Sequence, residues 1–244
     1  MTGATQVTRT STGAPADGAP LSGAALRREQ GRREMRAAIL DEARRLLTEE
    51  VAAALSMRAI ARALGYSPAA LYEYFPAKED IYKALYFKGT GGLGSRMVAA
   101  QELVPPGSSV RTALFEMGRA YRAYAHEQPE LFRLVFGDTS VHGQSPKTDD
   151  GERPGFDELV AVIEDGIAAG EIDSPAAEPV AVACWAIVHG FVVLEIIGCF
   201  GPNETQVVSD PAAPTDSLDG RPSPDALFDQ TLDRILLGVL TRTP

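Results

Sequence analysis

The fold is decided by residues 57–75, which read MRAIARALGYSPAALYEYF. Ser56, just before this stretch, can accept a backbone N–H bond and so form the N-cap of a first short helix at about 56–63. Gly65 is expected to end that helix, because glycine adopts a positive φ at little steric cost. The stretch therefore begins with a short, sharply bounded helix and a tight turn.

A second short helix, at about 68–74, follows this turn. Ser67 can cap it, and Pro68 takes its first position, where the missing N–H costs nothing. Leu71 and Phe75 lie one helical turn apart and are expected to point inward. Two short helices joined in this way predict a helix-turn-helix, whose second helix fits the major groove of DNA. The alternative is an ordinary pair of helices in a bundle.

A basic amphipathic helix precedes the motif. From Leu26 onward apolar residues recur at helical spacing, as at Met35, Ile39 and Ala43, while the opposite face carries several arginines. Residues 1–25 are rich in Thr, Ser, Gly, Ala and Pro, which predicts a disordered N-terminal arm.

The net charge of −10 at pH 7 is unevenly distributed along the chain. Residues 27–90 carry a net charge of +3, whereas residues 91–244 carry −13. Contact with phosphate needs a local cationic surface rather than a cationic chain. The charge pattern therefore favours a DNA-binding segment followed by an acidic domain.

The rest of the chain also has helical periodicity. Gly89–Gly94 interrupts a helix that starts near residue 77, and we interpret it as a joint between the two halves. No stretch alternates with period two, so the predicted fold class is all-α, with a three-helix domain at 26–88 and a larger helical domain at 89–244. The remaining helices are predicted at about 77–88, 108–127, 129–136, 156–169, 176–200 and 224–241.

The most apolar run, residues 180–200, is about long enough to span a bilayer, which takes roughly 20 residues. His189 and Glu195 interrupt it, and we expect a buried core or dimer helix instead of a membrane span. Cys184 and Cys199 have no metal-binding spacing and are expected to be reduced thiols. Since no apolar secretory signal begins the sequence, the expected location is cytoplasmic.

The run from Ala37 to Lys83 resembles the N-terminal domain of the TetR (tetracycline repressor) family. The resemblance implies a three-helix DNA-binding domain, a C-terminal domain that binds a ligand and dimerises, and release of operator DNA when the ligand binds. Further on, Cys184–Gly190 resembles a subgroup of this family marked by Trp, His and Gly in one helix. The residues that carry the first resemblance are Ile60-Ala61, Leu64-Gly65-Tyr66-Ser67, Leu71-Tyr72 and Tyr74-Phe75-Pro76-x-Lys78.

The resemblance also implies which residues contact DNA. The sequence departs from the family at Tyr74, where many members have His, and at Glu73, where many have a neutral or basic residue. Glu73 can accept from a cytosine amino group, or point away and pair with Lys78; the second is favoured because an unpaired carboxylate near phosphates is penalised. With the basic face of the first helix, the expected DNA-binding residues are Arg32, Arg33, Arg36, Met57, Arg58, Ser67, Ala69, Ala70, Tyr72, Tyr74 and Lys78.

Aromatic residues of the larger domain can wall a cavity for an apolar or aromatic effector. Trp185 and His189 share one face of their helix, and plain core packing is the alternative to a ligand-lining or dimer-contact role. The expected ligand-binding residues are Phe115, Tyr121, Tyr124, Phe132, Phe136, Trp185 and His189.

The last helix carries two apolar residues in every turn, a stripe wide enough to meet a partner as well as its own core. In the family, the last two long helices form a four-helix bundle with those of a second subunit. The expected dimer contacts are Leu232, Ile235, Leu236 and Val239.

The predicted function is a ligand-responsive, sequence-specific transcriptional regulator, a homodimeric repressor that leaves a near-palindromic operator when its effector binds. An effector-independent DNA-binding protein and a helical enzyme are the alternatives. An enzyme is disfavoured because His126, His142 and His189 lie far apart and no nucleophile or phosphate-binding motif occurs in a fitting context. No catalytic residue, cofactor or metal site is predicted.

Overall fold

The computed structural model describes residues 23–49, 56–137, 153–200 and 222–239. These residues contain nine helices and no strand, which confirms the all-α prediction. The helices are α1 (Gly23–Glu49), α2 (Met57–Leu64), α3 (Pro68–Tyr72), α4 (Lys78–Glu102), α5 (Val110–Glu127), α6 (Pro129–Phe136), α7 (Phe156–Ala168), α8 (Ala177–Ile196) and α9 (Pro224–Val239).

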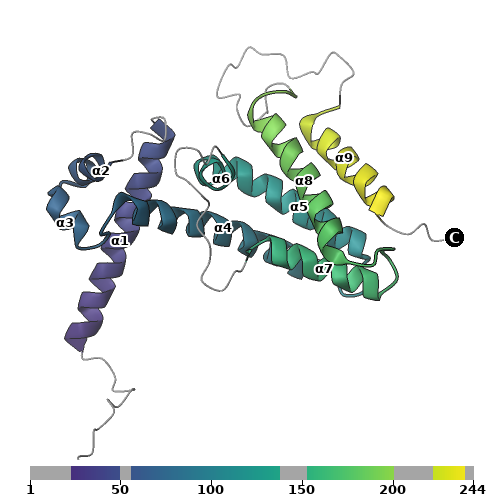
Figure 1. Cartoon of the computed structure of the whole chain (residues 1–244), viewed down its shortest axis with the longest axis horizontal. Coiled ribbons are helices and arrows are strands. Elements are labelled where there is room, and N and C mark those ends of the chain that lie inside the picture. The colour runs from purple at the N-terminus through teal and green to yellow at the C-terminus, as the bar shows by residue number, and fades with distance from the viewer. Residues whose placement is uncertain (1–22, 50–55, 138–152, 201–221, 240–244) are drawn as a thin grey trace, which may run out of the picture.

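Figure 1 shows two groups of helices that are joined by α4. One small group, α1 to α3, lies at one end, and α5, α7, α8 and α9 form a larger bundle at the other. The short helix α6 contacts α1, α4 and α5, so it lies between the two groups.

The helix-turn-helix forms through the caps that the sequence predicts. The Ser56 hydroxyl accepts a hydrogen bond from the backbone N–H of Ala59 at 3.2 Å, which begins α2. Gly65 ends α2 with a φ of 74°, in the left-handed region that favours glycine. Ser67 then caps α3 by accepting from the N–H of Ala70 at 3.3 Å. Local capping therefore sets both boundaries of the turn.

The small group encloses its own apolar core. Leu71 and Phe75 are each 1% exposed, which confirms that both point inward. Two residues of α6, Leu131 and Leu134, complete this core, so α6 supports the DNA-binding end of the molecule. The other fully buried members are Ile39, Ala43, Ile60, Ala61, Ile81 and Leu85.

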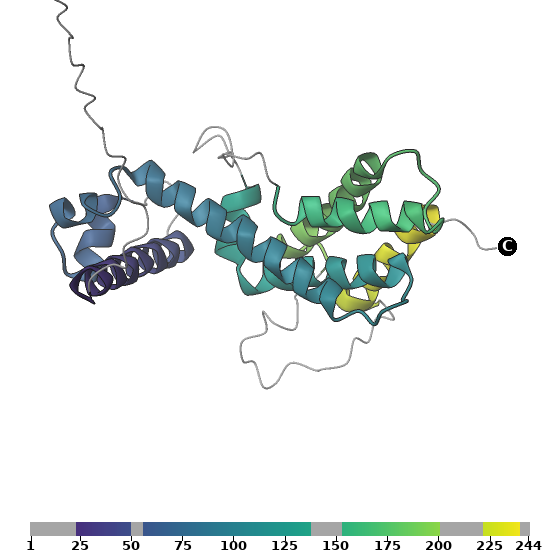
Figure 2. The same cartoon turned by 90° about the horizontal axis from the view of Figure 1, so that it is seen from below.

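The expected joint at Gly89–Gly94 is wrong, because α4 continues through it as one helix from Lys78 to Glu102 (Figure 2). Three of its four glycines, Gly89, Gly92 and Gly94, lie where neighbouring segments touch the α4 backbone. A side-chain carbon added to Gly89 would lie 2.7 Å from Val135 Cγ2 on α6. These glycines therefore permit close packing instead of ending the helix.

Two more of these glycines make the same kind of contact. A side-chain carbon on Gly92 would lie 3.0 Å from the hydroxyl of Tyr124 on α5, and one on Gly94 would lie 2.9 Å from the backbone nitrogen of Gly155, just before α7. The Tyr124 hydroxyl also donates a 2.9 Å hydrogen bond to the Gly89 carbonyl oxygen. Thus α4 is tied to α5, α6 and α7 along one short segment.

A buried ion pair connects α5 and α8. Glu195, which is 2% exposed, accepts two hydrogen bonds from the guanidinium of Arg122, at 2.8 and 2.5 Å. Its carboxylate also bonds to His126 Nε2 at 2.8 Å. Burial raises the pKa of Glu195, but the hydrogen bonds from Arg122 and His126 outweigh it and lower that pKa to about 2. The carboxylate is therefore ionised and fully paired.

The helix α8 is long and apolar enough to cross a membrane by length and composition alone. In the structure it packs against α5, α7 and α9. Its inward face includes Cys184, Val188 and Val192, whereas Val182 and Ile187 are 48% and 40% exposed. The helix is therefore apolar on a buried face and on an exposed face.

The contact between Gly92 and Tyr124 predicts opposite effects for two neighbouring alanine variants. Gly92→Ala should lower the free energy of unfolding by about 1–3 kcal/mol, because the Tyr124 ring must shift. Gly91→Ala, with nothing within 4 Å of the added carbon, should raise it by up to about 1 kcal/mol. Urea unfolding of both variants measures this difference, and equal effects would contradict the packing role of Gly92.

Removing the charge of Glu195 should be strongly destabilising. Glu195→Gln leaves the partly buried guanidinium of Arg122 with only the exposed Asp225 as a charged partner, and should cost about 3–5 kcal/mol of unfolding free energy at pH 7. Glu178→Gln, which breaks the exposed pair with Arg153, is the control and should cost at most about 1 kcal/mol.

The effect of Glu195→Gln should also depend on pH. The folded-state pKa of about 2 lies below the ordinary value of 4.5, so the stabilisation is complete above about pH 5 and is lost as the pH falls toward 2. The stability difference between wild type and variant should shrink over that range. A difference that stays constant from pH 7 to pH 3 would contradict the ion pair.

Candidate functional site

The helix α3 lies at the outer end of the molecule (Figure 1), and its sequence supplies small and aromatic side chains. Ser67 and Ala69 are exposed, Ala70 is half-buried and Tyr72 is 51% exposed, while Leu71 anchors the helix from behind. Small residues let a helix approach base edges closely, and a tyrosine hydroxyl can bond to phosphate. The geometry of α3 is that of a recognition helix.

Two arginines of α1 hold the segment that follows α3. Arg32 donates to the Glu73 carbonyl oxygen at 3.2 Å, and its guanidinium lies 5.9 Å from the centre of the Tyr74 ring. Arg36 donates to the Tyr74 carbonyl oxygen and lies 4.1 Å from the centre of the Phe75 ring. Both arginines therefore position the end of the recognition helix, in addition to adding positive charge near it.

The other residues that are expected to contact DNA differ in how exposed their side chains are. Arg33 and Arg58 are exposed, and Lys78 is half-buried at the first position of α4. Met57 is only 6% exposed and belongs to the small core, so its side chain supports α2 from within and does not reach a ligand. The structure corrects the prediction at that position.

The preferred role for Glu73 is also wrong. In the part of the chain that the structure describes, no ion pair joins Glu73 to Lys78, and the Glu73 side chain is exposed. The first turn of α4 is capped differently, since Asp80 accepts from the backbone N–H of Ala77 at 2.9 Å. A carboxylate thus remains on the surface next to the recognition helix.

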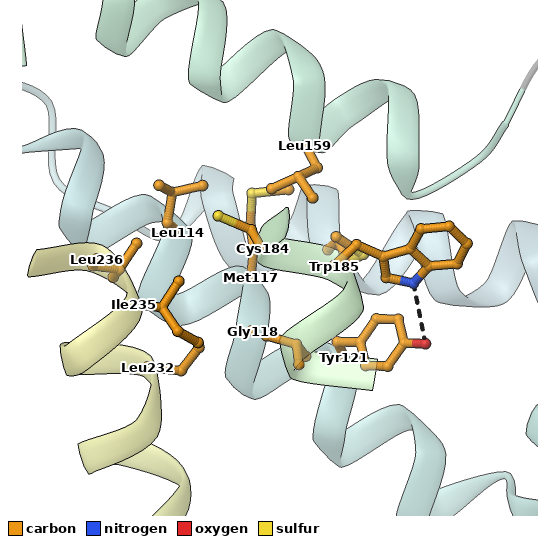
Figure 3. A pocket seen from close by; sticks show the side chains of 12 residues that line it. Leu114, Met117, Gly118, Tyr121, Leu159, Cys184, Trp185, Leu232, Ile235 and Leu236 are labelled. Atoms are coloured by element: carbon orange, nitrogen blue, oxygen red, sulfur yellow. Dashed lines mark hydrogen bonds between the residues drawn. The ribbon is translucent and has the colours of Figure 1, made fainter. Parts of the chain in front are cut away.

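The larger bundle contains an apolar pocket with a cavity volume of about 40 Å³ (Figure 3). None of its lining side chains carries a charge, since burial raises the pKa of Tyr121 and raises that of the Cys184 thiol to about 11. This volume is far below that of a typical small-molecule site, so a bound molecule must push lining side chains apart. The lining residues are Met97, Leu114, Met117, Gly118, Tyr121, Leu159, Cys184, Trp185, Val188, Leu232, Ile235 and Leu236.

An aromatic cluster closes one side of this pocket. The Tyr121 hydroxyl lies 2.9 Å from His189 Nδ1, and Trp185 Nε1 donates to that hydroxyl at 3.4 Å (Figure 3). Burial lowers the pKa of His189, which keeps the imidazole neutral and able to accept from Tyr121. Phe132 and Phe136 of α6 stack within this cluster, with ring centres 5.0 Å apart. The polar atoms therefore satisfy one another.

Only two of the seven expected ligand-binding residues, Tyr121 and Trp185, line the pocket. Phe132, Phe136 and His189 pack behind them in the aromatic cluster. The other two have structural contacts: Phe115 lies under the guanidinium of Arg119 at 4.9 Å, and Tyr124 binds the α4 backbone. For His189, the core-packing alternative fits the structure.

The expected dimer contacts on α9 need correction. Leu232 and Leu236 are 4% and 2% exposed within their own chain and line the pocket, so the prediction that they face a partner is wrong. Ile235 is half-buried and also lines the pocket, and the side chain of Val239 lies outside the described residues. The exposed apolar side chains of this region are Val182, Ile187, Leu194, Ile197 and Leu237.

Two features of the larger bundle have no direct sign in the sequence. Gly118 lines the pocket, and a side-chain carbon added to it would lie 3.1 Å from Leu232 Cδ1. A single glycine within a helix does not indicate a cavity in the sequence. Glu195 appeared only as a polar interruption of an apolar run, whereas it is the centre of the ion pair between α5 and α8.

Comparisons with known proteins agree with this architecture. Residues 39–85 match a family described as bacterial regulatory proteins, tetR family, and residues 114–213 match one described as Tetracyclin repressor-like, C-terminal domain. The second match gives the type of domain, not the Trp-His-Gly subgroup.

Individual relatives point in the same direction. An uncharacterized HTH-type transcriptional regulator of Mycobacterium tuberculosis is 26% identical over 173 residues, which are 71% of this chain and 75% of that protein. The solved structure of a regulatory protein, SCO4313, is 29% identical, with a TM-score of 0.63 over 86% of this chain and 98% of that one. The transcriptional regulator FadR of Bacillus subtilis, in complex with stearoyl-CoA, shares the fold at 17% identity, with a TM-score of 0.60 over 83% and 98% of the two chains. With its helix-turn-helix and its helical C-terminal domain, the chain belongs to the TetR family of DNA-binding transcriptional regulators.

Proposed function

We propose that this chain is a homodimeric, ligand-responsive repressor that leaves a near-palindromic operator when a small uncharged, apolar or aromatic molecule fills the pocket. One observation carries the proposal: the core under the helix-turn-helix and the core around the apolar pocket both contain residues of α4 and α6. A molecule in the pocket can therefore shift helices on which the recognition helix depends.

The α6 helix packs against both cores, with different residues for each. Phe132 and Phe136 pack in the aromatic cluster beside Tyr121, whereas Leu131 and Leu134 belong to the core under the helix-turn-helix. A ligand that displaces the cluster would move both faces of α6 together, because packed cores switch between discrete arrangements. The proposed coupling therefore runs through packed side chains of α6, and not through a joint at Gly89–Gly94.

The chemistry of the pocket supports the class of effector. Apart from the Tyr121 hydroxyl, the Trp185 N–H and the Cys184 thiol, its lining side chains are hydrocarbon or thioether. The nearby Arg122 is already bound to Glu195 and Asp225. A carboxylate or phosphate in the pocket would be buried without a partner, which is strongly unfavourable. The stearoyl-CoA in the FadR structure is therefore no guide to this effector.

The exposed face of α8 supports a homodimer. Val182, Ile187 and Leu194 of α8 are 40–48% exposed, Ile197 directly after this helix is 66% exposed, and Leu237 of α9 is 60% exposed. A helix with apolar residues on both faces is typical of one that packs on its own core and on a second subunit. A two-fold axis along α8 would place two recognition helices for two half-sites.

The proposal also places the protein in the cytoplasm, without a cofactor, a metal or a membrane partner. The effector-independent DNA-binding protein is the alternative, and a helical enzyme is less consistent with relatives that are transcriptional regulators. DNA selected from a random pool by the purified protein would supply an operator for the experiments below.

Lys78 is expected to hold the DNA backbone rather than a base. Lys78→Ala should weaken binding equally for operator variants, and should reduce the slope of log affinity against log salt by about one unit. Lys88→Ala is the matched control on the same helix, since Lys88 Nζ pairs with Asp41 at 2.9 Å. Fluorescence anisotropy across a salt series measures both, and an unchanged slope in Lys78→Ala would refute the phosphate contact.

The proposed dimer face predicts a clear difference between two exposed positions. Ile187→Asp, on α8, would bury a carboxylate without a partner in the interface, at a cost of several kcal/mol, about the value for breaking a buried pair. Light scattering should then show a monomer. Leu103→Asp, at a residue that is 84% exposed between α4 and α5, should remain a dimer. A dimeric Ile187→Asp protein would rule out this face.

A further inference from the structure

The helix α9 supplies one wall of the apolar pocket. Leu232, Ile235 and Leu236 line the pocket from α9, and the other lining residues come from α4, α5, α7 and α8. In Figure 3 the α9 side chains lie on the opposite side of the pocket from Tyr121 and Trp185. In Figure 1 α9 lies at the outer edge of the bundle, beside α8.

The N-terminal end of α9 is firmly anchored. Phe228 is 1% exposed and its ring packs on that of Phe191 on α8, with centres 5.1 Å apart. The guanidinium of Arg122 lies 5.2 Å from the centre of the Phe228 ring and binds Asp225 at 2.6 Å, while holding Glu195. An aromatic contact and a partly buried ion cluster thus hold this end.

The C-terminal half of α9 is held more weakly. Its apolar residues Leu232 and Leu236 face an empty cavity on one side, so they lack part of the contacts that a filled core would supply. Opposite Leu232, α5 has only the backbone of Gly118. The polar contact at this end is the ion pair of Arg111 with Asp233, whose side chains are 37% and 48% exposed. An exposed ion pair contributes little and weakens in salt.

We propose that the C-terminal half of α9 is the door of the pocket, with a pivot at Phe228 and a latch formed by Arg111 and Asp233. The inference rests on the proposed ligand-binding role of the pocket. Outward rotation about the pivot opens the pocket beside Gly118 and leaves the cluster of Arg122 and Glu195 intact. The other walls are held from several sides. The cluster of Arg122 and Glu195 ties α5 to α8, Tyr124 ties α4 to α5, and α7 packs against α4, α5 and α8.

The rate at which an apolar probe enters the pocket tests the door. The uncharged dye N-phenyl-1-naphthylamine accepts excitation energy from tryptophan, and Trp185, in the pocket wall, is the only tryptophan of the chain. Stopped-flow energy transfer therefore reports dye that binds close to Trp185. Asp233→Asn should speed both association and dissociation about two- to fivefold, the factor that corresponds to an exposed ion pair, with little change in Kd.

Two comparisons isolate the latch. High salt should accelerate the wild type and leave Asp233→Asn unchanged, because only the wild type retains the ion pair to screen. The reversed pair, Arg111→Asp with Asp233→Arg, should restore slow entry of the dye. Glu178→Gln breaks the exposed pair with Arg153 at the start of α7 and should keep wild-type rates.

The outcomes separate the door from the ligand site. Energy transfer with equal rates in wild type and Asp233→Asn overturns the door and leaves the pocket as a ligand site. No energy transfer in any variant overturns the ligand site and, with it, the door.

Hydrogen exchange gives a reading that needs no ligand. In Asp233→Asn the amides of residues 232–238 should exchange about two- to fivefold faster than in the wild type, whereas those around Phe228 should not change. Equal acceleration along the whole of α9 would mean that the helix loosens as a unit, and would overturn the pivot.

Discussion

Tyr124 lies against the bare backbone of α4, with its hydroxyl on the carbonyl oxygen of Gly89 and its ring beside Gly92. This contact sets the distance between α4 and α5, and the packing of α6 and α7 against α4 depends on that distance. With α5 held close, α6 can pack on Gly89 through Val135, and α7 can start beside Gly94. A glycine in the middle of a helix is about 1 kcal/mol less favourable than an alanine. The close packing that it allows must therefore contribute more than this to the stability of the fold.

The same contact makes α4 and α6 a rigid connection between the two cores. The core under the helix-turn-helix includes Leu131 and Leu134 of α6, and the Tyr82 hydroxyl donates to the Leu134 carbonyl oxygen at 3.4 Å. On the other face of α6, Phe132 and Phe136 meet the aromatic cluster at the pocket. A small displacement at the pocket therefore has a packed path to the recognition helix, with no flexible joint to absorb it.

The sequence predicts well what neighbouring residues decide, and less well what distant residues decide. Ser56, Gly65 and Ser67 fix the helix-turn-helix boundaries through bonds to residues three or four positions away, so the pattern alone located them. Whether a glycine ends a helix or admits a neighbour depends on what packs there, and Gly92 could not reveal Tyr124. Likewise, Glu195 is paired with Arg122, which lies 73 residues earlier. The apolar stripe of α9 indicated that this face is covered, but not whether its own chain or a second subunit covers it.

The two apolar faces of α8 have a consequence for the life of the protein in the cell. An isolated subunit must keep Val182, Ile187 and Leu194 in contact with water, whereas in the proposed dimer they are covered. Association then contributes to the stability of each subunit by mass action, so the resistance of the regulator to unfolding and proteolysis rises with its own concentration. A regulator of this kind is cleared fastest when it is scarce, which sharpens the boundary between a cell that holds the regulator and one that has lost it.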